Sequence, residues 1–100
     1  MSTVDQRIAV TAAARRMLEE AKDRARQHAM DDPDRSFYCG VETAAMHALH
    51  PAAQAVWGDD RSWLDAESAG FQDGYLKAMT ALTVAEIAGR PPMRVVLPEP

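Results

Sequence analysis

Cysteine, asparagine and aromatic residues are scarce in this chain, and long hydrophobic runs are missing. A single cysteine excludes an intrachain disulfide and fits a reducing compartment such as the cytoplasm. No basic segment followed by an apolar stretch opens the sequence, and no apolar run approaches the ~20 residues that a membrane span requires. These features predict a cytoplasmic protein.

Positive charge is also in short supply. The 15 Asp and Glu residues outnumber the 11 Lys and Arg residues, so the chain is acidic, with a formal net charge of −4. Such a surface does not attract nucleic acid or an anionic membrane over long range, and we expect neither as the main partner. Alanine is abundant and arginine outnumbers lysine. Such a composition is typical of a GC-rich coding sequence, such as that of an actinobacterium or one of its phages.

The motifs that mark common enzymes are missing as well. The sequence has no P-loop, no Rossmann glycine pattern, no serine nucleophile elbow and no paired catalytic carboxylates. Its acidic clusters at 31–34 and 59–60 lack the alternating spacing of a calcium loop and stand where turns favour aspartate. We therefore expect a protein that is not an enzyme and that carries no cofactor.

What the chain does contain is two segments in which small and apolar side chains recur at three- and four-residue steps. The first set comprises Thr11, Ala14, Leu18, Ala21, Ala25 and His28. The last comprises Leu64, Phe71, Tyr75, Ala78, Leu82 and Ala85, and Ala66, Gly70, Gly74 and Ala78 also follow one another at every fourth residue. This spacing places each set on one side of an α-helix. Because alanine and glycine project little, we expect the two helices to approach each other closely.

The alternation of apolar segments and helix breakers predicts a single all-α domain of 100 residues. Two long helices would pack antiparallel with two short helices between them, and an extended proline-rich tail would follow. The long helices are expected at about 4–30 and 62–88, the short ones at about 37–49 and 51–57, and the tail at 89–100.

Proline, glycine and capping side chains set these boundaries. The Asp-Pro pair at 32–33 ends the first helix, because proline cannot continue a helix, and Ser36 caps the second. Gly89 caps the last helix. Gly70 and Gly74 leave two alternatives: the last helix begins only after Gly70, or both glycines lie inside it and let another backbone come near. We favour the second, because the seam keeps its phase through both glycines.

The last helix carries more apolar surface than one buried stripe accounts for. Several of its large apolar residues lie off the main stripe, which is typical of a helix that is buried on two sides or shared with a partner. Prolines forbid a helix in the tail, whose apolar residues would suit an extended segment on an apolar groove of this chain or of a partner. The expected interaction residues are Leu76, Val84, Ile87, Val95, Val96 and Leu97.

One cluster in the second helix has the chemistry of a metal ligand or a nucleophile. Thiolate and imidazole groups suit zinc or copper, and the candidate ligands are Cys39, His47 and His50. On a straight helix, however, Cys39 and His50 stand ~16 Å apart along the axis, too far to share one ion. Cys39 lies in the first turn of its helix, where it is either a nucleophile served by a histidine or a buried, inert thiol.

A histidine and a group of aromatic residues complete the candidates. His28 either fills a partly buried position in the first seam or faces a carboxylate such as Glu67 or Glu86. The second arrangement would couple its protonation to assembly near about pH 6–7. The aromatic residues are expected to form a hydrophobic plug where the short helices meet the last one, and they are Phe37, Tyr38, Trp57, Trp63 and Phe71.

The sequence as a whole favours an interaction protein: an adaptor, a subunit or an inhibitor of another protein. Surplus apolar surface, small-residue seams and missing catalytic motifs all point this way. The simplest use of the surplus is a homodimer formed through the Ala- and Gly-lined seams. The alternative is a metal- or small-ligand-binding sensor built around Cys39, His47 and His50.

Overall fold

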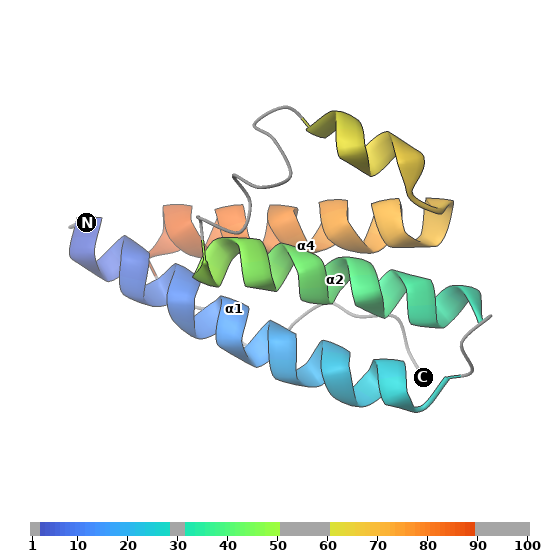
Figure 1. Ribbon diagram of the computed structural model, residues 1–100. Coiled ribbons are helices and arrows are strands. Elements are labelled where there is room, and N and C mark those ends of the chain that lie inside the picture. Colours follow the sequence, from blue (N-terminus) through green and yellow to red (C-terminus); the bar gives the residue numbers. More distant parts are fainter. Residues whose placement is uncertain (1–2, 29–31, 51–60, 90–100) are drawn as a thin grey trace.

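The computed structural model describes residues 3–28, 32–50 and 61–89, and all of its regular structure is helical (Figure 1). The elements are α1 (Thr3–Arg26), α2 (Pro33–Leu49), the 3₁₀ helix η1 (Arg61–Ala66) and α4 (Ala69–Ala88). The all-α prediction is confirmed for these segments. The short helix expected at 51–57 and the tail beyond Gly89 lie outside the described residues.

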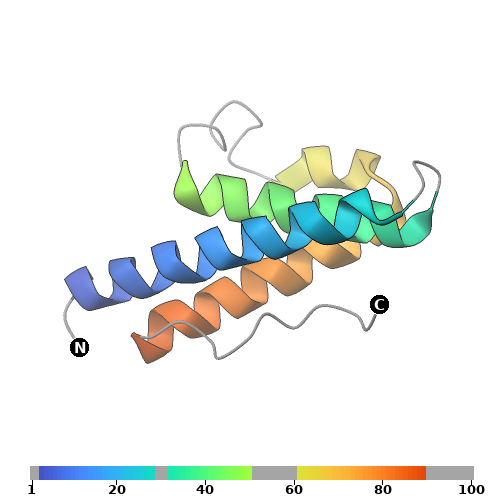
Figure 2. The ribbon, with the colours of Figure 1, turned by 90° about the horizontal axis from the view of Figure 1, so that it is seen from below.

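The three α-helices pack side by side into one bundle, and each contacts the other two. Helix α1 runs opposite to both α2 and α4, whereas α2 and α4 run in the same general direction (Figures 1 and 2). The expected antiparallel packing of the two long helices is therefore confirmed. Figure 1 also shows that the beginning of α1 and the end of α4 lie at the same end of the bundle.

Helix α2 begins four residues earlier than expected, so the prediction of a start at 37 with Ser36 as the cap was wrong. Asp32 is the N-cap: its side chain accepts a hydrogen bond of 2.9 Å from the backbone N–H of Asp34. Pro33 takes the first helical position, where its missing N–H costs nothing and its fixed φ suits the helix. The Asp-Pro pair therefore starts α2 but does not end α1, which finishes at Arg26, before the expected end at about residue 30.

The segment expected to be one helix at 62–88 is divided in two. Residues 61–66 form η1, and α4 begins only at Ala69, with Ser68 as its N-cap. The Ser68 hydroxyl accepts from the Phe71 N–H at 3.3 Å, which satisfies an amide of the first turn. At the other end, Gly89 is the expected C-cap, in the left-handed region with φ 69°.

Two glycines mark the closest approach of backbones, and they join α2 to α4. A Cβ added to Gly74 of α4 would collide with the carbonyl oxygen of Phe37, and one added to Gly40 of α2 would collide with that of Phe71. Both Gly70 and Gly74 lie inside α4, as the favoured alternative predicted, but the close approach of another backbone is at Gly74, whereas Gly70 is in the first turn. The partner is α2, however, and not the first long helix. Helix α2 can approach this closely because Gly40, like Gly74, has no side chain at the contact.

The buried face of α1 consists of alanines and Met17, whereas α2 and α4 combine buried alanines with larger side chains such as Tyr38 and Tyr75. The set expected on one side of the last helix is buried, with Phe71 partly so, but Leu64 belongs to η1; of the residues expected at every fourth position, Ala66 is exposed. On α1 the buried face also includes Ala9 and Ala13. The buried hydrophobic residues are Ala9, Ala13, Ala14, Met17, Ala21, Ala25, Phe37, Tyr38, Val41, Ala44, Ala45, Leu64, Tyr75, Ala78, Leu82 and Ala85.

Candidate functional site

His47, one of the expected metal ligands, is a core residue. It is only 3 % exposed, and its Nδ1 lies 3.1 Å from the hydroxyl of Tyr75, which is fully buried. The indole of Trp63 packs edge to face against both rings, with centroid distances of 5.6 Å to His47 and 5.2 Å to Tyr75. Burial disfavours the charged imidazolium and lowers the pKa of His47 below its usual 6.5. This cluster is part of the packing between α2 and the later elements.

The structure does not bring Cys39, His47 and His50 together. In the described segments, no set of three ligand atoms within 4.8 Å of one another includes any of these residues. His50 is an exposed C-cap residue whose backbone N–H donates to the Met46 carbonyl at 2.8 Å. Cys39 is partly buried. Because α2 begins at Pro33, Cys39 lies in its second turn and not in the first. Of the three histidines that could serve it as a base, His47 contacts Tyr75, His28 contacts Asp32, and His50 is exposed at the far end of α2.

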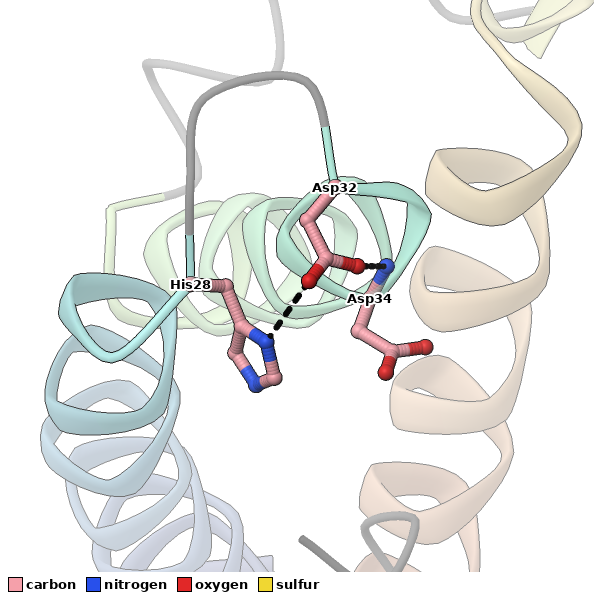
Figure 3. Close-up of side chains that lie close together, drawn as sticks. All are labelled: His28, Asp32 and Asp34. Atoms are coloured by element: carbon pink, nitrogen blue, oxygen red, sulfur yellow. Dashed lines mark hydrogen bonds and ion pairs between the residues drawn. The ribbon is translucent and has the colours of Figure 1, made fainter.

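A group that does bring ligand atoms together lies in the turn between α1 and α2. We call His28, Asp32 and Asp34 the turn cluster (Figure 3). His28 Nδ1 is 3.1 Å from Asp32 Oδ2, and Asp32 Oδ1 accepts the N–H of Asp34. The expected carboxylate partners of His28 were therefore wrong: the partner is Asp32, four residues along the chain, and neither Glu67 nor Glu86.

The turn cluster holds the end of α1 against the start of α2. The Asp34 N–H and then the His28 side chain stabilise the Asp32 carboxylate, which lowers its pKa. The His28 ring stacks on Tyr38 at 5.5 Å, and Arg35 donates to the His28 carbonyl at 3.0 Å. A histidine with two carboxylates is a ligand set for a divalent cation. Here, however, both Asp32 oxygens already have partners within the turn: Oδ1 caps α2 and Oδ2 contacts His28.

The outer face of α4 carries three of the six exposed large hydrophobic residues in the described part of the chain. We use this name for Leu76, Thr80, Thr83, Val84 and Ile87. Leu76 is 46 % exposed, Val84 57 % and Ile87 69 %, so the sequence expectation that these three lie off the buried stripe is confirmed. Val95, Val96 and Leu97, the other expected interaction residues, lie outside the described residues.

The two threonines make this face more apolar than its composition indicates. The Thr80 hydroxyl donates to the Leu76 carbonyl and the Thr83 hydroxyl to the Met79 carbonyl, each at 2.9 Å. Both hydroxyls are thus engaged by their own helix. The outer face of α4 carries no charged side chain from Leu76 to Ile87, because Lys77 and Glu86 stand at its two edges.

A smaller apolar patch on α1 was not anticipated from the sequence. Val4 is 66 % and Ile8 62 % exposed, and Ala12 continues the same line. Their four-residue spacing in the sequence places them on one side of α1, outside its buried seam. The patch lies toward the end of the bundle where α4 finishes (Figure 1), and there Arg7 and Val10 line a shallow pocket together with Glu86.

Comparison with known proteins does not indicate a function. The chain matches no protein-family model, no curated protein and no solved structure. None of the helices in residues 3–28, 32–50 and 61–89 has both the length and the apolarity needed to cross a bilayer. Among the described surfaces, the outer face of α4 is the one whose exposed apolar side chains the fold itself does not explain.

Proposed function

We propose that the protein is a small protein-interaction module that binds a helix of its partner on the outer face of α4. The observation that carries the proposal is the uncharged, half-exposed surface from Leu76 to Ile87. A helix face in contact with water is ordinarily polar. The second half of α1 follows that rule: its exposed positions are charged and include the ion pair of Arg26 with Asp23 at 3.2 Å.

The spacing of this surface supports a helical partner. Leu76, Thr80, Thr83 and Ile87 follow one another at steps of four, three and four residues, the pattern by which packed helices interlock. Methyl groups of the two threonines leave shallow positions between the larger ends. A second helix with an apolar stripe is complementary to such a surface.

The seams favoured by the sequence do not supply this docking surface. The alanines of both seams are buried against helices of the same chain; they are Ala14, Ala21 and Ala25 on α1 and Ala78 and Ala85 on α4. Association through them would require the bundle to open. The proposal therefore keeps the interaction function expected from the sequence and places it on the outer face of α4.

Site-directed photo-crosslinking in the producing cells tests this function. A benzoylphenylalanine placed at Thr83, on the face, is expected to give a discrete crosslinked product with another polypeptide. The same probe at Gln27, which is exposed at the end of α1, is the matched control. Leu76→Glu should abolish the Thr83 product, because it places a charge in the apolar contact, whereas Gln27→Glu should not. No product from Thr83, or equal products from both sites, would overturn the proposal.

A further inference from the structure

We propose that the helix bound on the outer face of α4 is α4 of a second copy of this chain, packed antiparallel about a two-fold axis between Ala81 and Leu82. This inference rests on the proposed function and specifies the partner. It follows from the symmetry of the face, from the position of its charges and from the chemistry of its members.

Four members of the face, Leu76, Thr80, Thr83 and Ile87, have the same spacing in both directions. Steps of four, three and four residues are symmetric about the midpoint between Ala81 and Leu82. An antiparallel copy therefore places Leu76 level with Ile87 of the second copy, and Thr80 level with Thr83. Large side chains meet large ones at the two ends, and threonine methyl groups meet in the middle. Self-complementarity of this kind is what a two-fold interface requires, because the same patch serves both sides.

The charges are placed so that the face can meet itself. A two-fold interface duplicates every charge it contains, and a charged centre would repel its own copy. The outer face of α4 has none. At the edges, Lys77 stands nine residues along the axis from its copy, and so does Glu86, which is a separation of about 14 Å. That separation exceeds the Debye length of about 10 Å at 0.1 M salt.

The contact is small, so we expect the association to be weak. Leu76, Val84 and Ile87 are the large apolar side chains of the face, and all three are between 46 % and 69 % exposed in the single chain. A single pair of short helices buries less than a standard interface, so we expect a dissociation constant on the order of 10–100 µM. The dimer should accordingly form and dissociate within the concentration range of ordinary solution experiments.

Cysteine crosslinking tests both the second copy and its direction. In a Cys39→Ser background, Leu76→Cys and Ile87→Cys are made as separate variants. Mixed together and mildly oxidised, they should form a crosslinked dimer with one chain of each kind. Each variant alone should form at least tenfold less, because two copies of one position stand about 16 Å apart along the axis, beyond disulfide reach. A parallel pair would give the opposite pattern and would overturn the inference.

Sedimentation provides a readout that does not depend on cysteine. The chain should move from monomer to dimer between about 5 and 500 µM. Leu76→Glu should raise the dissociation constant at least tenfold, whereas Gln27→Glu, which also adds one negative charge at an exposed position, should change it less than twofold. Circular dichroism should show equal helix content in both. A monomer at every concentration would overturn the inference.

Failure of the self-pairing is distinguishable from failure of the proposed function. A photo-crosslinked product from Thr83 at twice the chain mass of 11.0 kDa supports the second copy. A product of any other mass overturns the self-pairing and retains the interaction module with a different partner. If neither photo-crosslinking nor sedimentation detects association, both proposals fail.

Discussion

The hydroxyl of Tyr75 and Nδ1 of His47 lie 3.1 Å apart in the core, although the two residues are separated by 28 positions in the sequence. The hydrogen bond joins α2 to α4, and Trp63 packs against both rings. A polar pair of this kind is stable inside a protein when its groups satisfy each other. Protonation of the His47 imidazole is therefore coupled to the packing of the bundle.

Stability should fall as the pH drops below about 6.5, because of His47. Burial lowers the pKa of His47 in the folded chain, whereas an exposed imidazole takes up a proton near its usual 6.5. The unfolded chain therefore binds the extra proton in this range, and the free energy of unfolding decreases by at most about 1.4 kcal/mol per pH unit for one group. Above pH 6.5 the imidazole is neutral in both states, so His47 no longer makes the free energy of unfolding depend on pH. Urea unfolding between pH 5 and 8 measures the slope.

Two glutamine variants isolate the contribution of His47 to that slope. His47→Gln removes the titrating group and keeps a polar side chain in the core, so the slope between pH 5 and 6.5 should flatten. His50→Gln makes the same change at the exposed end of α2 and should leave the slope close to that of the wild type. Equal slopes in the wild type and in His47→Gln would contradict the assignment.

Gly74→Ala should destabilise the fold, although alanine is the better helix former. In a helix interior this substitution ordinarily gains up to ~1 kcal/mol. Here the new Cβ would collide with the Phe37 carbonyl, which belongs to a rigid helix. Overpacking of this kind costs about 1–3 kcal/mol, and that outcome should dominate. Gly40→Ala should behave alike because of Phe71. A gain in the midpoint of urea unfolding for either variant would refute the close approach of α2 and α4.

Asp32→Ala should lower the melting temperature more than Asp34→Ala does. Both changes remove one carboxylate from the turn cluster, but only the Asp32 side chain caps α2 and contacts His28. Because the pKa of Asp32 is lowered in the folded chain, its stabilising effect is present above about pH 4 and is lost as the carboxylate is protonated at lower pH. Asp32→Asn retains a capping oxygen and should fall between the wild type and Asp32→Ala. Thermal unfolding at pH 7 ranks the three variants, and equal losses from Asp32→Ala and Asp34→Ala would argue against the cap.

Local periodicity was sufficient to predict which faces of the long helices are buried. The spacing from Tyr75 to Ala85 fixes one side of α4, and the same spacing leaves Leu76, Val84 and Ile87 outside it. These are properties of a single helix, so the sequence contains them. Part of the proposed docking surface was predictable for the same reason.

The remaining differences come from residues whose role depends on another element. Pro33 reads as a helix breaker in the sequence but occupies the first position of α2, and the side chain of Asp32 caps that start. Gly74 indicates that a backbone comes near, but only the position of Gly40 identifies α2 as that backbone. The burial of His47 likewise depends on the distant Tyr75, so its ligand-like spacing on α2 was misleading.

Salt should strengthen the association proposed for the outer face of α4. Each chain carries a net charge of −4, so two copies repel each other at long range, while the face between them is uncharged. Raising the salt from 0.1 M to 1 M shortens the Debye length from about 10 Å to about 3 Å and removes most of that repulsion. The apolar contact does not depend on charge, so the dissociation constant should fall severalfold. Sedimentation of the wild type at both salt concentrations measures the change, with Leu76→Glu as the control that should remain largely monomeric at both. A dimer that weakens in 1 M salt would be held by ion pairs, and the self-pairing of an uncharged helix face would then be the wrong account.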